Sequence, residues 1–104
     1  MSAKKATIKI GDRQFQATPM QTDEMIRYLD QVEELESQRT KKGLSTYLKC
    51  TREIIFASIK RADPEITLET VGSLDASETI EAMEAIIRVS TPGEIPSIPK
   101  WTVN

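Results

Sequence analysis

Few side chains in this sequence have the types and spacing that enzymatic chemistry needs. His is absent from all 104 residues, which removes the commonest general base and any Ser-His-Asp or Cys-His arrangement. The single cysteine, Cys50, lies beside Lys49 and close to Arg52, and cationic neighbours can lower the pKa of a thiol. Because it has no histidine partner, we interpret Cys50 as a structural thiol. The sequence therefore predicts a protein that is not an enzyme and that needs no cofactor.

Carboxylates are the other side chains that could do chemistry. Glu33 and Glu36 lie three residues apart, so on a helix their oxygens would share one face and could meet a cation. The chain has no EF-hand loop and no HExxH motif. Gly11 and Gly43 stand outside any phosphate-binding glycine pattern. We therefore predict no metal site and interpret the acids as a solvated helix face.

The most suggestive set of side chains is apolar and belongs to residues 91–104. Ile95, Ile98 and Trp101 recur every third residue among three prolines. A polyproline helix has about three residues per turn, so these side chains would line one face, and Trp is a common interface anchor. The segment is predicted to be an extended Pro-rich tail that docks on a partner or a second copy. A tail folded back on its own helices and a disordered tail are the alternatives.

Near the N-terminus, the sequence predicts a β-hairpin over residues 6–18. Ile8, Ile10 and Phe15 are its apolar members, and Gly11-Asp12 is a turn signal between two short β-prone runs. Two strands alone are marginally stable in water. The hairpin must therefore lie on helices or add to a sheet in another copy.

Hydrophobic residues at helical spacing predict the remaining elements. We expect a helix at 23–38 capped by Thr22, followed by an exposed connection at 39–43. A central helix should then run from the cap Ser45 to about Arg61. A short helical turn after Thr67 and a helix at 76–89, opened by Asp75 and Glu78, complete the set. The fold class is thus α+β, mainly α: an N-terminal β-hairpin followed by a small three- to four-helix bundle. Residues 1–90 form one domain and residues 91–104 the tail.

Composition limits the classes of protein to which the chain can belong. Leu, Ile, Val and Phe number 24 of 104 residues, so the predicted core is thin and a partner would help to complete it. No stretch has the length and hydropathy of a membrane span. The first ten residues lack the apolar region of a secretion signal, so we expect an intracellular protein with no membrane partner.

The net charge of −2 conceals blocks of opposite sign. Residues 23–38 carry six acids and one base, whereas residues 39–62 carry seven bases and one acid. Opposite charges on successive elements favour neighbouring helices that pack antiparallel. The alternative is that the basic block contacts nucleic acid. The acidic balance of the whole chain argues against that alternative, so no nucleic-acid partner is expected.

Four stretches together carry a likeness to a known family: Thr7–Phe15 (TIKIGDRQF), Pro19–Met25 (PMQTDEM), Ile54–Val71 (IIFASIKRADPEITLETV) and Leu74–Val89. Their order resembles the small tail assembly chaperones of long-tailed bacteriophages, over roughly residues 7–90. The resemblance implies a non-catalytic helper in the host cytoplasm that binds the tape measure protein, keeps it soluble, helps to recruit tail tube subunits and is absent from the mature virion. Apart from the resemblance, a thin core and an apolar tail suit a protein that self-associates as a homo-oligomer or binds a helical client. The alternative is a small head–tail joining or tail completion protein that is retained in the virion.

Apolar side chains on two helices and on the tail are predicted to bind partners. The residues are Met25, Leu29 and Met83, together with Ile95, Ile98 and Trp101. Methionine is flexible and polarisable, which suits an adaptable binding face. Ordinary core filling is the alternative for each methionine.

Overall fold

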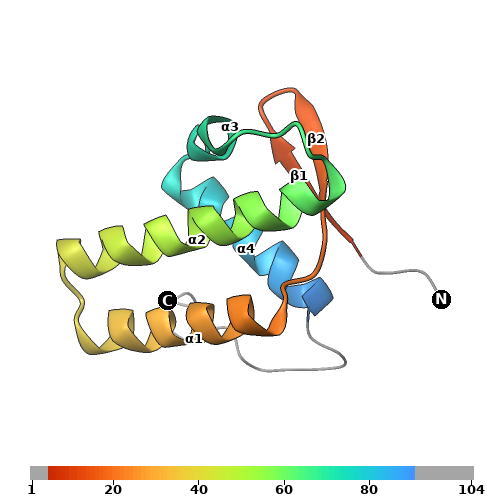
Figure 1. Ribbon diagram of the computed structural model, residues 1–104. Helices are drawn as coiled ribbons and strands as arrows, with labels where there is room; N and C mark the ends of the chain where they lie inside the picture. Colours follow the sequence, from red (N-terminus) through yellow and green to blue (C-terminus); the bar gives the residue numbers. More distant parts are fainter. Residues whose placement is uncertain (1–4, 91–104) are drawn as a thin grey trace.

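In the computed structural model, which describes residues 5–90, the first element is a β-hairpin (Figure 1). Strand β1 (Ala6–Ile10) pairs antiparallel with β2 (Arg13–Ala17), and Ile8 lies opposite Phe15. Gly11 in the turn adopts a φ of 61°, which costs glycine little because it has no Cβ. The predicted hairpin and its turn are confirmed.

One face of this hairpin is apolar and lies against helices. Its buried side chains are Ala6, Ile8, Ile10, Phe15 and Ala17. Strand β2 packs against the second helix and β1 against the last. Burial on helices therefore stabilises a two-stranded sheet that would be marginal alone.

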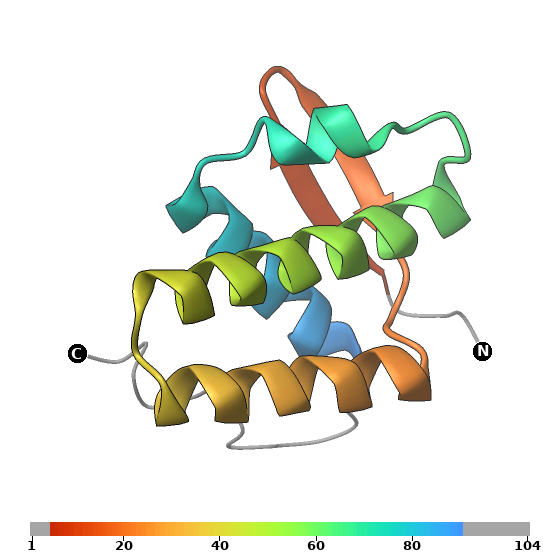
Figure 2. The ribbon, with the colours of Figure 1, turned by 60° about the vertical axis from the view of Figure 1, so that its left-hand side comes forward.

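Four helices follow: α1 (Thr22–Ser37), α2 (Lys41–Ala62), α3 (Leu68–Gly72) and α4 (Ala76–Ser90). Helix α2 is central, since it packs against α1, α3, α4 and β2. In Figures 1 and 2, α1 runs alongside α2 and α4 crosses behind it. The predicted α+β, mainly α class is confirmed. Within residues 5–90, none of the helices is long and apolar enough to cross a membrane.

Two of the predicted helix starts are wrong. Helix α1 is capped by Gln21 rather than Thr22, and its Gln21–Glu24 pair forms a capping box. Helix α2 begins at Lys41 instead of after Ser45, because the Thr40 side chain caps it by accepting a hydrogen bond from the Gly43 N–H at 3.0 Å. The connection between α1 and α2 is therefore residues 38–40, and Gly43 lies in the first turn of α2.

The later caps agree with the sequence. The Thr67 hydroxyl accepts from the Thr70 N–H and starts α3. Asp75 and Glu78 exchange two hydrogen bonds, at 2.7 and 3.0 Å, at the start of α4. Each bond satisfies a backbone N–H that the first helical turn leaves without a partner.

The core forms where α2 meets α1, α4 and the hairpin. Its most completely buried large side chains are Tyr47, Ile54, Ile55, Ile59, Met83 and Ile86. Helix α1 buries Tyr28, Val32 and Leu35, whereas Ile26 and Leu29 on the same helix are exposed. The physical reason is Tyr28, whose hydroxyl lies 3.2 Å from that of Tyr47 and whose ring packs against the Tyr47 ring.

Candidate partner-binding surfaces

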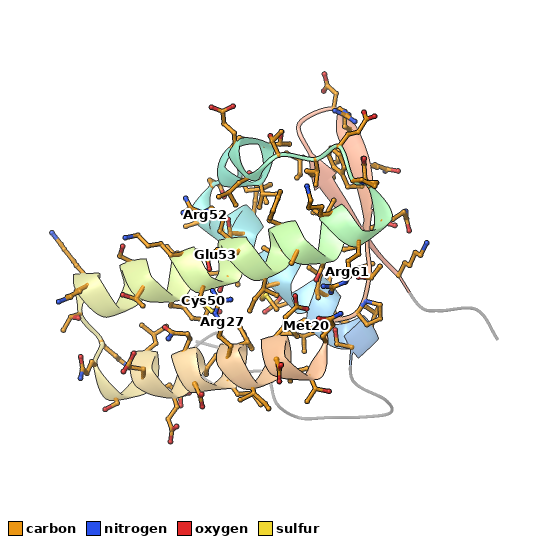
Figure 3. All side chains as sticks on the ribbon, in the orientation of Figure 1. Met20, Arg27, Cys50, Arg52, Glu53 and Arg61 are labelled. Atoms are coloured by element: carbon orange, nitrogen blue, oxygen red, sulfur yellow. The ribbon has the colours of Figure 1, made fainter. Side chains whose placement is uncertain are left out.

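Cys50 lies on α2, where it is buried facing α1 (Figure 3). Burial raises the pKa of its thiol; nearby Arg27 lowers it and Glu53 raises it, and the net pKa lies above the ordinary value. The thiolate is the reactive form of cysteine. A buried thiol with a raised pKa is therefore poorly suited to be a nucleophile, and the geometry agrees with a structural role.

The acidic face of α1 is exposed to solvent. Glu33 and Glu36 are both exposed. Within residues 5–90, no group of three or more His, Cys, Asp or Glu side chains is placed to hold a metal ion. This face is therefore an exposed acidic surface.

The predicted partner-binding residues fall into three different places. Met83 is a core residue with 1% of its surface exposed, which favours the alternative of ordinary core filling; it faces inward on α4, a helix that packs against α2. Met25 is half-buried at the edge of the core, and Leu29 is 46% exposed. Ile95, Ile98 and Trp101 lie outside the described residues.

One turn of α1 presents an apolar surface, which we call the α1 face: Met25, Ile26 and Leu29. Ile26 is 53% exposed. Helical spacing places Glu33 and Glu36 on the same side of α1 as Leu29, one and two turns further along. The α1 face is therefore an apolar surface that continues into an acidic one.

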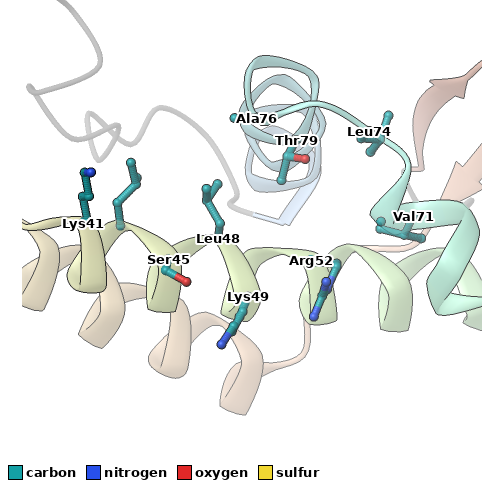
Figure 4. Close-up of a pocket in the computed structure, with 11 residues that line it drawn as sticks. Lys41, Ser45, Leu48, Lys49, Arg52, Val71, Leu74, Ala76 and Thr79 are labelled. Atoms are coloured by element: carbon teal, nitrogen blue, oxygen red, sulfur yellow. The ribbon is translucent and has the colours of Figure 1, made fainter.

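A second apolar surface is a hollow beside the N-terminal half of α2, which we call the α2 groove (Figure 4). Its apolar lining includes Leu44 and Leu48 from α2, and Val71 and Leu74 from α3 and the link to α4. It has a volume of about 450 Å³. A hollow of about 430 Å³ adjoins it at Lys41 and Leu44 and reaches Leu35 at the end of α1.

The rim of the α2 groove is basic. Lys41, Lys49 and Arg52 line it, and Arg39 lines the adjoining hollow. Among the described residues, no carboxylate lines either hollow. The Arg52 Nε is buried and has no hydrogen-bond partner in the described part of the chain. The groove therefore combines an apolar floor with donors that favour an acceptor.

Leu44 lies four residues before Leu48, at the spacing of one apolar helix face, yet its side chain is 44% exposed. That face extends toward the start of α2, where Leu44 is not enclosed by the core. The sequence does hint at this exposure, because the basic residues Lys41 and Lys42 come shortly before Leu44. The partners Val71 and Leu74 come from more than twenty residues further along the chain, so local spacing could not reveal the groove.

The described residues therefore include two apolar surfaces. The α1 face has acidic neighbours, and the α2 groove has a basic rim. Such surfaces are typical of sites that bind protein segments. Comparisons with protein-family models, with curated proteins and with solved structures found no match to this chain.

Proposed function

We propose that this chain is a non-catalytic phage tail assembly chaperone that binds the tape measure protein, keeps it soluble and helps to recruit tail tube subunits. The observation that carries the proposal is the α2 groove, an open hollow beside α2 with apolar side chains in its lining and a basic rim. The likeness of residues 7–90 to tail assembly chaperones supports the choice of client. The tape measure protein of long-tailed phages is mostly helical and has apolar faces to cover.

The shape and chemistry of the α2 groove suit an amphipathic helix. Helices bind grooves through apolar anchors spaced one turn apart, and Leu44 and Leu48 present a matching row one turn apart on α2. The basic rim would pair with carboxylates that flank the anchors of the client.

The same features allow the client to be released when the tail is built. Lys41 and Lys49 are exposed, and exposed ion pairs contribute only about 0–1 kcal/mol each. The complex is therefore expected to be transient, as a helper that leaves the particle requires.

Co-expression with the tape measure protein tests the proposal directly. The tape measure protein is expected to aggregate alone and to be recovered in a soluble complex with this chain. Leu44→Asp places a charge in the groove and should abolish recovery. Leu68→Asp is the matched control, because Leu68 is also exposed but lies on α3 outside the groove lining, and it should bind as the native chain does.

Two results would contradict the proposal. If the tape measure protein stays aggregated with the native chain, and the chain instead appears in purified virions, it is a retained head–tail joining or tail completion protein. If Leu44→Asp and Leu68→Asp both capture the client normally, the α2 groove is not the binding site. Circular dichroism melts of both variants should match the native chain, since both positions are exposed.

A further inference from the structure

We infer that the free edge of strand β1 is a docking site for an extended peptide that carries a basic side chain. Within residues 5–90 the sheet has two strands, in the order β1-β2, so each strand has one edge without a neighbouring strand. Where β2 ends, the Thr18 N–H donates to the Ser58 carbonyl of α2 at 3.0 Å. Beside β1, by contrast, lies a hollow of about 460 Å³ between the strand and α4.

The hydrogen-bond pattern of the hairpin shows which backbone groups of β1 point to this edge. The two-residue turn joins Ile10 to Arg13, and the bond that closes such a turn makes them a hydrogen-bonded pair. Bonded and non-bonded pairs alternate along an antiparallel ladder, so Thr7 and Lys9 belong to non-bonded pairs. Their N–H and C=O groups point away from β2, and within residues 5–90 no backbone hydrogen bond outside the hairpin reaches them. The edge therefore offers two donors and two acceptors to a third strand.

The floor of the hollow is one side of α4. It is formed by Glu78, Glu81, Ala82 and Ala85. The alanines are small, so they leave room for the side chains of a strand that lies above them. A second copy paired through its own β1 would bring its own α4 to the same place, because α4 packs against β1. A single extended segment therefore fits this edge better than a second domain.

The charges of the lining favour a basic ligand. Glu78 and Glu81 are exposed, and in the described part of the chain neither forms an ion pair. Glu78 already accepts a hydrogen bond from the Asp75 N–H at 3.0 Å, so Glu81 is the carboxylate with more acceptor capacity left. Lys9 is the base of the lining, and two carboxylates with one ammonium leave a net negative charge. A Lys or Arg of the ligand would balance it.

The spacing of these residues sets the pattern of the ligand. Glu81 and Ala85 lie one helical turn apart, which is about 6 Å along α4. Side chains two residues apart on one face of a strand are about 7 Å apart. The ligand class is therefore an extended segment with a base two positions from a small apolar residue. The site shares no lining residue with the α2 groove, so this inference does not depend on the proposed function.

Nuclear magnetic resonance of the isotope-labelled full chain tests the inference with a probe, the peptide acetyl-Thr-Lys-Thr-Val-Thr-Lys-Thr-amide. Its sequence reads the same in both directions, so either strand orientation places the two lysines and the valine on one face. Without the peptide, the Thr7 and Lys9 amides should exchange with solvent faster than the Ile8 amide. With it, both amides should shift and exchange at least about tenfold more slowly. A matched peptide with Glu in place of Lys should bind at least about tenfold more weakly.

Substitutions in the hairpin and on α4 locate the site. Thr7→Pro removes an outward N–H of β1 and no bond to β2, so peptide binding should weaken by about tenfold. Gln16→Pro is the matched control: Gln16 lies opposite Thr7 and faces the other edge, and both variants lose the same side-chain hydrogen bond between these residues. Glu81→Lys should also abolish binding. Glu33→Lys, which reverses an exposed charge on α1, should bind as the native chain does.

Three results would overturn the inference. If millimolar peptide leaves the Thr7 and Lys9 amides unshifted, or shifts those of Leu44 and Leu48 instead, the β1 edge is not its site. If the Glu peptide binds equally well, the acidic floor does not choose the ligand. If Gln16→Pro weakens binding as much as Thr7→Pro, the outward groups of β1 are not the ones used. Circular dichroism checks that both proline variants fold, and Glu81→Lys carries the test if they do not.

Discussion

The guanidinium of Arg61 binds both carboxylate oxygens of Glu24, each at 3.0 Å. Arg61 lies in the last turn of α2 and Glu24 in the first turn of α1, so the contact joins the two helices at the end far from their connection. Arg61 also donates to the Thr18 hydroxyl at 2.8 Å and to the Pro19 carbonyl at 2.9 Å. One side chain thus links the segment between β2 and α1 to the last turn of α2.

Glu24→Gln is expected to destabilise the domain in a pH-dependent way. Burial raises the pKa of Glu24, but hydrogen bonds from Arg61 and from the Gln21 backbone lower it, and the net pKa lies below the ordinary value of 4.5. The ionised carboxylate therefore stabilises the fold above about pH 4.5, and this stabilisation is lost as the pH falls through the lower pKa of the folded state. Urea denaturation should show a loss of about 1 kcal/mol at pH 7, since the pair is partly exposed, and almost none near pH 2.

Glu53→Gln is the control for this ion pair. Glu53 pairs with Arg27, and the two side chains are 51% and 50% exposed. Exposed pairs contribute little because water screens them, so the expected loss is below about 0.5 kcal/mol. An equal loss for both variants, or a Glu24→Gln effect that persists in acid, would show that the ion pair with Arg61 is not the source of the stabilisation.

The two tyrosines predict how the fold responds to alkali. Burial raises the pKa of Tyr28 and of Tyr47 above the ordinary value of 10.0, and the Tyr47 hydroxyl contributes to the shift of Tyr28. The neutral phenols are therefore favoured in the folded state, so stability is fully present below about pH 10 and is lost as the pH rises above it. No other tyrosine is present in the chain, so tyrosinate absorbance at the red edge of the aromatic band reports on this pair alone.

Tyrosinate is expected to form in the same transition as unfolding. The absorbance change and the loss of the helical circular dichroism signal should coincide along a pH titration. The Tyr28→Phe variant should keep the delayed ionisation of Tyr47, because burial is the largest cause of its raised pKa. Ionisation of either tyrosine near pH 10 with the helical signal intact would contradict the buried pair.

The elements of the fold could be predicted where their signals are local. The hairpin follows from alternation around Gly11, and the start of α4 from Asp75 and Glu78, because strand pairing across a tight turn and capping boxes use neighbouring residues. Which side of α1 faces the core could not be predicted. Tyr28 and Leu29 are adjacent candidates for burial, and Tyr28 is buried because it contacts Tyr47 in another helix. The α2 groove depends on the same kind of long-range contact.

The predicted start of α2 is wrong for a different reason, which a substitution at Gly43 can test. Gly43 resembles the end of a loop, yet it lies in the first turn of the helix. A Cβ at this position would lie 2.5 Å from the Gln38 carbonyl oxygen. Gly43→Ala should therefore destabilise the domain by about 1–2 kcal/mol, although alanine favours helices by about 1 kcal/mol. Chemical denaturation measures the difference.

Gly72→Ala is the matched control, since Gly72 is also helical. A Cβ there would lie 3.7 Å from the Arg52 Cδ, which is an ordinary contact. The substitution restricts the unfolded chain, so it should leave stability unchanged or raise it by up to about 1 kcal/mol. Stabilisation by Gly43→Ala of the same size would mean that the close approach of residues 38 and 43 does not exist.

Met83→Ala separates a core role from a binding role for this methionine. Met83 is almost fully buried between α4 and α2, so truncation should leave a cavity and cost about 2–5 kcal/mol. Leu29→Ala removes a similar volume from an exposed position and should cost less than about 1 kcal/mol. Thermal melts of both variants measure the contrast. If Met83→Ala instead keeps near-native stability but no longer captures the client, Met83 belongs to the binding surface. Truncation of a buried side chain would lower the stability of the domain, whereas truncation of an accessible one can weaken binding alone.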